Sequence, residues 1–187
     1  IMIKEFEKRL LSSFILIPIV IFFIIQGSVF FIFFLSILFL ATSYEWLKMN
    51  KKNNLLKLLG LIFLLFSFYA AFFLRDTLGP DFFLLIICVC IFTDIGGYVF
   101  GKFLKGPKLT KISPNKTYAG VAGGFILSLI AGLIFLKISE DELFNSYTID
   151  FLIFIFIISL ISQIGDLIIS YFKRKAKIKD TGKFLPG

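Results

Sequence analysis

The chain has 187 residues, of which 58% are hydrophobic, against about 45–50% in a typical globular domain. It carries 20 Lys and Arg residues against 12 Asp and Glu, a formal net charge of +8. A soluble domain of this size has too much surface to bury so many apolar side chains, and a disordered chain would contain far fewer of them. The composition excludes both classes and predicts an integral membrane protein with basic ends.

Six apolar segments follow one another along the chain, and each predicts a helix that crosses or enters the bilayer. They cover residues 10–25, 28–41, 55–74, 81–93, 119–136 and 151–170. Only Gln26 and Gly27 separate the first two, which either both cross or form a re-entrant hairpin. The fourth is short unless its helix continues through Asp94 to Gly101. The sequence therefore predicts an all-α, polytopic membrane protein with about six transmembrane or re-entrant helices.

The basic residues predict the orientation of these segments. If all six cross and the N-terminus is cytoplasmic, 18 of the 20 cations lie on the cytoplasmic side and only Arg75 and Lys137 lie outside. Cytoplasmic loops of membrane proteins carry such an excess of Lys and Arg. We therefore expect a cytoplasmic N-terminus, and a hairpin inserted from the inner face would leave this assignment unchanged.

Several kinds of site are excluded by the residue types present. The sequence contains no His, which removes His-based acid–base catalysis, Ser-His-Asp triads and His-ligated zinc. Its two cysteines, Cys88 and Cys90, are two residues apart and point in different directions on a helix. We interpret them as ordinary membrane-helix residues.

The last apolar segment carries a polar stripe. At helical spacing its members share one face; they are Ser159, Ser162, Asp166, Ser170 and Lys173. A charged group at membrane depth costs about 2.5–3.5 kcal/mol on insertion scales, so Asp166 indicates function. The stripe is expected to face protein or a water-filled cleft. The alternative is a helix-packing aspartate paired with a neighbouring lysine.

Glycines accompany a second aspartate in the fourth segment. Positions i, i+3, i+4 and i+7 hold Asp94, Gly97, Tyr98 and Gly101, with Gly96 beside them. Such glycines allow close approach of a ligand or of another backbone, and both alternatives stay open. We interpret the GxxxG of Gly120 and Gly124 as helix packing.

Two basic stretches, residues 102–118 and 171–187, lie on the predicted cytoplasmic side. The first mixes Lys with Gly, Pro, Ser and Thr and leads into a helix, an arrangement that suits phosphate groups. Membrane orientation and attraction to anionic lipids are the ordinary explanation of such clusters. However, Asp166 and Asp180 lie among the cations, and carboxylates beside a polyphosphate site indicate Mg²⁺. A Walker A motif and a GxGxxG motif are both absent from the sequence.

Several ordered motifs carry a family resemblance over nearly the whole chain. They are Lys8-Arg9-Leu10 with Glu45-Trp46; Asp94-Ile-Gly-Gly-Tyr98 with Gly101-Lys102; Ser113-Pro-Asn-Lys-Thr117 with Gly120; and Gly165-Asp166-Leu167 with Ser170-x-x-Lys173-Arg174, Lys179-Asp180-x-Gly182 and Leu185-Pro186-Gly187. Together they resemble the phosphatidate cytidylyltransferases, also called CDP-diacylglycerol synthases. The last group is the most specific match.

The resemblance implies an enzyme that transfers a cytidylyl group from CTP to phosphatidate, giving CDP-diacylglycerol and pyrophosphate for phospholipid synthesis. It implies catalytic roles for Asp166, Lys173 and Asp180, with Mg²⁺ held at Asp166; a monovalent cation at the site is left open. The implied substrate-binding residues are Asp94, Ser113, Lys116, Thr117, Ser170, Arg174 and Lys179.

The resemblance also implies a place in the cell and a set of partners. The chain would form one membrane domain, residues 1–187, with N-terminal helices in 1–93 and a catalytic half in 94–187. It would lie in the inner (plasma) membrane with its site facing the cytoplasm. Membrane lipids are expected partners beside the two substrates, nucleic acid is not, and a homodimer is left open.

The sequence departs from the family pattern at three points. Ala119 and Ile169 stand where the family usually has Glu. The family signature continues with His-Gly-Gly and Asp-Arg-x-Asp, so we expect a further segment beyond Gly187 that supplies the second aspartate of the metal centre. Two alternatives remain: a non-catalytic relative or small transporter, and a CTP-dependent lipid kinase.

Overall fold

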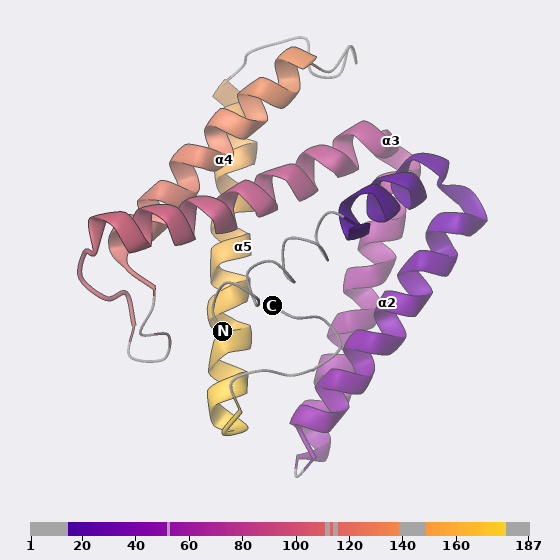
Figure 1. Cartoon of the computed structure of the whole chain (residues 1–187). Helices are drawn as coiled ribbons and strands as arrows, with labels where there is room; N and C mark the ends of the chain where they lie inside the picture. Colours follow the sequence, from indigo (N-terminus) through magenta and orange to yellow (C-terminus); the bar gives the residue numbers. More distant parts are fainter. Residues whose placement is uncertain (1–14, 52, 111–112, 114–115, 139–148, 179–187) are drawn as a thin grey trace. The chain divides into compact units, whose positions relative to one another are not determined.

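A computed structural model describes residues 15–51, 53–110, 113, 116–138 and 149–178 (Figure 1). Within these ranges the chain is helical apart from loops and one isolated bridge between Lys108 and Thr117. The helices are Ile15–Gln26, α2 (Ser28–Met49), α3 (Asn54–Leu104), α4 (Tyr118–Ile138) and α5 (Ile149–Lys175). Of these, α2 to α5 are long and apolar enough to cross a membrane. The predicted all-α class is confirmed, with four candidate membrane spans among the described residues.

Helix α3 contains the third and fourth predicted segments. Gly79 interrupts its 51 residues with φ 87° and ψ 167°, a conformation that favours glycine, and Pro80 follows. The chain therefore bends between the two apolar runs. The second arm continues helically through Asp94 and Gly101 to Leu104, which resolves the question of the short fourth segment.

Helix α2 also extends beyond its apolar run. The second predicted segment ended at residue 41, whereas α2 continues to Met49. Thr42 explains part of this extension. Its hydroxyl donates to the Leu38 carbonyl 2.8 Å away, so the polar side chain finds its hydrogen-bond partner within the helix. Hydropathy marks the part of a helix at membrane depth, while backbone hydrogen bonding continues into the interface.

The chain forms two compact units. In the first unit, Arg75 binds the end of the helix that stops before Gly27. Of the described residues, this unit comprises 15–51, 53–83 and 176–178. Gly27 has φ 60° and separates the helix Ile15–Gln26 from α2. The Arg75 guanidinium donates to the carbonyls of Ile24 at 2.9 Å and Ile25 at 3.0 Å. The positive φ favours glycine at this position, and a Cβ there would displace the Arg75 guanidinium from its present place.

The opposite end of α2 turns into α3 through a short polar connection. The Trp46 indole donates to the Leu56 carbonyl at 3.0 Å, and a Cβ on Gly60 would collide with that ring. Asn53 Oδ1 accepts from the Leu56 amide at 3.1 Å and so caps the start of α3. These contacts fix α2 and the first arm of α3 as a helical hairpin.

The second unit, Leu84–Lys175, contains the second arm of α3, α4 and α5. Glycines allow α3 and α4 to meet backbone to backbone: a Cβ at Gly120 would lie 2.7 Å from the Gly97 carbonyl oxygen, and one at Gly96 would collide with Gly123. Helices α4 and α5 pack along one another, with the rings of Phe125 and Phe156 stacked 4.4 Å apart. The glycines of α3 and α4 are thus helix-packing positions in this unit. For Gly96 and Gly97 this is the close approach of another backbone, one of the two alternatives, and for Gly120 it is the expected role.

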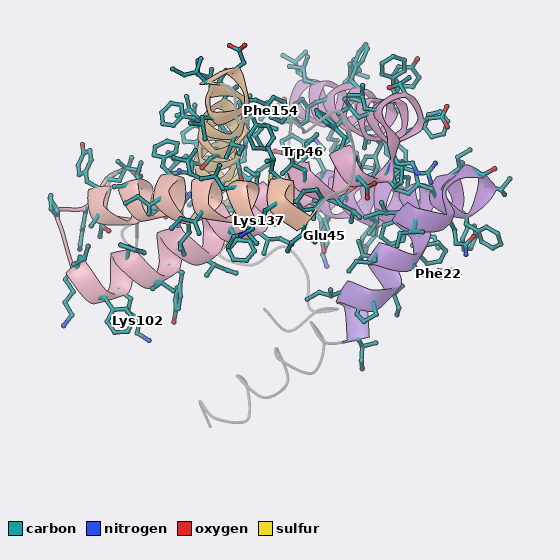
Figure 2. All side chains as sticks on the ribbon, turned by 90° about the horizontal axis from the view of Figure 1, so that it is seen from above. Phe22, Glu45, Trp46, Lys102, Lys137 and Phe154 are labelled. Carbon is teal, nitrogen blue, oxygen red and sulfur yellow. The ribbon has the colours of Figure 1, made fainter. Side chains whose placement is uncertain are left out.

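Few large apolar side chains are buried inside the structure. Side chains cover the outward surfaces of all the helices, with carbon predominating (Figure 2). Among the apolar residues, Val29 is 73% exposed and Phe66 is 70% exposed. Helices that are apolar around their whole circumference are typical of membrane spans, because acyl chains replace the protein core as their surroundings.

Candidate functional site

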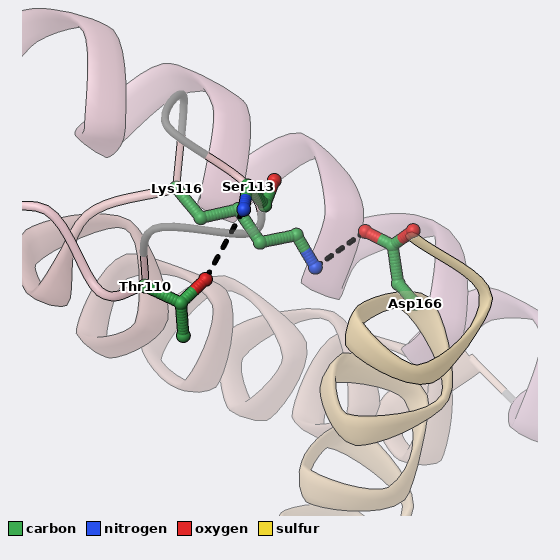
Figure 3. A network of polar contacts seen from close by, with 4 residues as sticks. All are labelled: Thr110, Ser113, Lys116 and Asp166. Carbon is green, nitrogen blue, oxygen red and sulfur yellow. Dashed lines mark hydrogen bonds and ion pairs between the residues drawn. The ribbon is translucent and has the colours of Figure 1, made fainter. Parts of the chain in front are cut away.

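The loop between α3 and α4 folds back on itself and presents Lys116. The Leu109 amide donates to the Lys116 carbonyl at 2.8 Å, and the Tyr118 amide donates to the Pro107 carbonyl at 3.2 Å. Further along, the Ser113 amide donates to Thr110 Oγ1 at 3.2 Å (Figure 3). These bonds hold the described part of the loop against the start of α4, so the position of Lys116 is determined by backbone pairing.

Thr117, a predicted substrate-binding residue, is the N-cap of α4. Its Oγ1 accepts from the Gly120 amide at 3.1 Å, the bond that an N-cap makes to the third helical residue. The same hydroxyl keeps its hydrogen for donation to another acceptor. The cap therefore fixes the direction of α4 immediately after Lys116.

Lys116 and Asp166 form an ion pair between this loop and α5. Nζ of Lys116 lies 2.5 Å from Oδ2 of Asp166, and the side chains are 27% and 54% exposed (Figure 3). The Asp94 carboxylate, on the second arm of α3, is near enough to interact electrostatically with both groups. Three elements that are distant in sequence thus bring two carboxylates and one ammonium group together, and we call Asp94, Lys116 and Asp166 the charged triad.

The polar stripe of α5 faces protein along its first half. Ser159 is fully buried and shares a hydrogen bond of 2.8 Å with Thr93 of α3. Gln163, which lies beside the stripe, donates to the Val121 carbonyl of α4 at 3.5 Å. Asp166 then meets the loop, where it pairs with Lys116, and pairing with a lysine is what the packing alternative expects. Because Asp166 remains half exposed, the pair is open to solvent or ligand rather than sealed in the interior.

The remaining predicted site residues lie further along α5 or outside the described residues. Ser170 and Lys173 are half-buried and Arg174 is exposed, four, seven and eight positions beyond Asp166. Lys179 and Asp180 lie outside the described residues. The structure thus brings together three of the ten predicted residues directly, with Ser113 and Thr117 in the adjoining loop.

The triad can be compared with the needs of Mg²⁺. Magnesium binds through one or two carboxylates together with water and substrate phosphates, and seldom through an all-protein cage. Asp94 and Asp166 provide two such carboxylates, and the Lys116 ammonium stands at Asp166 as a cation would. In the described ranges there is no group of three or more His, Cys, Asp and Glu side chains suited to a metal ion. The donors present therefore fit a hydrated Mg²⁺ that shares its ligands with a substrate.

Sequence reasoning did not single out Thr93, although it lies beside Asp94 and is 1% exposed. A lone threonine in an apolar run is usually satisfied by its own helix, and Thr93 does donate to the Val89 carbonyl at 2.7 Å. Its second partner, Ser159, is 66 positions away. Only the packing of α3 against α5 reveals it.

Comparisons with known proteins cover this site. A model of the cytidylyltransferase family matches residues 55–187, which include the whole charged triad. A phosphatidate cytidylyltransferase of Rickettsia bellii is 34% identical over 187 residues, covering 96% of this chain and 80% of the relative. That of Rickettsia conorii is 33% identical, covering all of this chain and 85% of the relative.

A shorter match comes from a different genus. The phosphatidate cytidylyltransferase of Staphylococcus saprophyticus is 41% identical over 110 residues, or 58% of this chain and 41% of the relative. No solved structure shows significant similarity to the chain. The family match over most of the sequence, and the near-complete coverage by relatives more than 30% identical, lead to one conclusion: the chain belongs to the cytidylyltransferase family.

Proposed function

We propose that this protein transfers the cytidylyl group of CTP to phosphatidate, giving CDP-diacylglycerol and pyrophosphate in phospholipid synthesis. The observation that carries the proposal is the convergence of Asp94, Lys116 and Asp166 from α3, the following loop and α5. The relatives named phosphatidate cytidylyltransferase support the choice of nucleotide and lipid.

The reaction needs little covalent participation from the protein. A phosphate oxygen of phosphatidate attacks the α-phosphorus of CTP, a new P–O bond forms, and the bond to the β-phosphate breaks as pyrophosphate leaves. Positioning and charge neutralisation account for most catalysis of this kind. Lys116 is suited to neutralise one of these phosphates, because its ammonium group is partly exposed beside the start of α4.

Basic and hydroxyl side chains around the triad would complete the phosphate sites. The Thr117 hydroxyl, which keeps its hydrogen for donation, lies next to Lys116. On α5, Ser170, Lys173 and Arg174 continue the polar stripe from Asp166 toward the basic segment. We assign the loop residues Ser113, Lys116 and Thr117 and this end of α5 to the two substrates, together with Lys179 and Asp180 of the basic segment.

Asp166, with Asp94 beside it, would hold Mg²⁺, which when bound supplies charge neutralisation and orientation of the triphosphate. The protein's own part is to keep two carboxylates at a fixed separation and to offer Lys116 as an alternative partner for Asp166. Lys116 balances one of the two carboxylates, so the charged triad keeps one formal negative charge before a cation or substrate arrives.

The contacts within each unit agree with the predicted order of crossings, and the orientation with a cytoplasmic N-terminus rests on the distribution of the cations. In the first unit Arg75 binds the carbonyls of Ile24 and Ile25, and all three belong to the outer side in that orientation. In the second unit Lys116 and Asp166 both belong to the inner side. The triad would then open to the cytoplasm of the inner membrane, where CTP is found.

Labelled CTP separates this function from its alternatives. The full-length protein in lipid nanodiscs is given phosphatidate and CTP labelled either in cytosine or in the γ-phosphate. The proposal expects cytosine label in the lipid product and the γ-label in pyrophosphate. γ-Label in the lipid would instead identify a CTP-dependent kinase, and the absence of both products together with no binding of Mg·CTP would indicate a non-catalytic relative.

A further inference from the structure

Two hydrogen bonds tie α5 to its neighbours just ahead of Asp166. The first joins Thr93 of α3 to Ser159 of α5 at 2.8 Å, and both side chains are at most 1% exposed. The second joins Gln163 of α5 to the Val121 carbonyl of α4 at 3.5 Å. No substrate could reach Thr93 or Ser159, so their part in any reaction must be indirect.

The positions of these bonds relate them to the charged triad. Thr93 directly precedes Asp94, and Ser159 lies seven residues before Asp166, which is two helical turns, about 10 Å, along the same face of α5. The contact between Thr93 and Ser159 therefore sets where the Asp94 carboxylate of α3 lies relative to the Asp166 carboxylate of α5. Gln163, one turn before Asp166, fixes the same helix against the part of α4 that follows Lys116.

Geometry at Gly124 shows that the two bonds form one cluster. A Cβ added there would lie 3.0 Å from the Thr93 carbonyl oxygen and 3.1 Å from Gln163 Nε2. The glycine thus makes room for both α3 and the amide of Gln163 at the junction of the three helices. Burying a hydroxyl or amide side chain among apolar helices costs free energy unless the group is hydrogen-bonded. An apolar side chain would pack these helices without that cost, so packing alone does not explain the polar residues here.

We propose that Thr93 and Ser159, supported by Gln163, are positioning residues that set the separation of Asp94 and Asp166 for cation and CTP binding. Since Val89 offers only a carbonyl, Thr93 donates its hydrogen there, and Ser159 donates to Thr93. Loss of the Thr93 oxygen leaves the buried Ser159 hydroxyl without this acceptor, and α5 is then free to shift along α3. This inference rests on the proposed function, because it assigns the triad to a cation and a nucleotide.

The test compares Thr93→Val and Ser159→Ala with two matched controls. Thr93→Ser keeps the hydroxyl and should restore wild-type behaviour. Ser128→Ala removes another fully buried hydroxyl, but one that bonds only the Phe125 carbonyl of its own helix at 2.9 Å. Ser128→Ala therefore reports the general cost of losing a buried hydroxyl in this unit.

Two readouts do not depend on turnover. The first is the distance distribution between spin labels at Ile95→Cys and Ile168→Cys, two exposed positions beside the two aspartates, in a background with Cys88 and Cys90 replaced by alanine. The second is the affinity for Mn²⁺ in the absence of CTP, followed by its paramagnetic resonance signal. Both use the full-length protein in nanodiscs, and thermal unfolding of each variant is measured beside them.

The proposal expects Thr93→Val and Ser159→Ala to shift or broaden the label distance and to weaken Mn²⁺ binding on the order of tenfold, as supporting residues of metal sites do. Thr93→Ser and Ser128→Ala should leave both values unchanged. An unchanged distance in Thr93→Val, or a changed distance with wild-type Mn²⁺ affinity, would overturn it. A wild-type protein that binds no Mn²⁺ would also overturn the proposal. A wild type that binds Mn²⁺ but forms no CDP-diacylglycerol would refute the proposed function while the two readouts still decide the positioning role.

Discussion

The ammonium group of Lys116 lies 2.5 Å from a carboxylate oxygen of Asp166, and this pair connects the loop before α4 to the middle of α5. Asp94 is near enough to interact with both partners. Asp166 is 54% exposed and Lys116 27% exposed, so solvent screens the pair and its contribution to the free energy of unfolding is small. The pair is therefore not needed for stability, and the proposed function assigns it to ligand binding.

Replacement of Lys116 by Gln is expected to have opposite effects on the two ligands. Without the ammonium group, Asp166 is free for a divalent cation, so Mn²⁺ binding without CTP should become stronger. CTP loses a cationic partner, and kcat/KM for CTP should fall about 10-fold or more, the value of one charge-assisted hydrogen bond. Titration with Mn²⁺ and steady-state kinetics measure the two effects.

Lys137→Gln is the matched control for this experiment, because Lys137 is an exposed lysine at the other end of α4. It should leave both quantities unchanged. Weaker Mn²⁺ binding in Lys116→Gln would contradict the competition between Lys116 and the cation.

Asp166→Asn is expected to abolish detectable formation of CDP-diacylglycerol, with a loss of more than about 100-fold, since even supporting residues of metal sites cost 10–100-fold. The amide keeps the shape of the side chain but loses its charge, so the ion pair with Lys116 disappears. The thermal midpoint should change little, because the carboxylate is half exposed.

Asp150→Asn serves as the control, since Asp150 is an exposed carboxylate in the first turn of the same helix. It should retain wild-type activity. Near-normal activity of Asp166→Asn would remove Asp166 from the catalytic assignment, whatever the outcome for the other site residues.

The helices and the polar face of α5 could be predicted from the sequence because both depend on local pattern. Long apolar runs specify membrane spans, and a 3-4-4-3 spacing places Ser159 and Asp166 on one face without knowledge of any partner. The helix ends were less predictable. Hydropathy stops at the membrane interface, whereas α2 continues to Met49 through backbone bonds and a self-satisfied Thr42.

The partner of Asp166 could not be predicted from the sequence. The predicted cytoplasmic side carries 18 cations, and charge alone does not distinguish among them. Lys116 is selected by backbone bonds within its loop, above all the one between Leu109 and Lys116, and by the cap at Thr117. Similarly, Arg75 was predicted only as an outer-loop cation, and its carbonyl partners at Ile24 and Ile25 follow from packing over some 50 residues of separation.

Gly96→Ala is expected to destabilise the second unit. The added Cβ would collide with the backbone of Gly123, which cannot rotate away as a side chain can, so α3 and α4 must separate. Overpacking of this kind costs about 1–3 kcal/mol, and the thermal midpoint in detergent should fall measurably. Because Asp94 is two residues away, activity should fall as well.

Gly165→Ala is the control, because nothing lies within 4 Å of a Cβ at that position although it adjoins Asp166. Alanine is favoured over glycine in a helix by about 1 kcal/mol, so this variant should be as stable as the wild type or more so. Equal thermal midpoints for the two variants would argue against close packing of α3 on α4.

Accessibility of single cysteines tests the orientation of the chain. Asp76 lies beside Arg75, whose guanidinium caps the helix Ile15–Gln26, whereas Lys51 lies in the polar connection between α2 and α3; both are exposed. With Cys88 and Cys90 replaced by alanine, Asp76→Cys should react with an impermeant maleimide in intact cells, because the proposed orientation places Arg75 and its surroundings outside. Lys51→Cys should react only after the membrane is permeabilised, since the cytoplasmic side holds most of the cations. Reaction of Lys51→Cys in intact cells, with protection of Asp76→Cys, would reverse the orientation and move the charged triad away from cytoplasmic CTP.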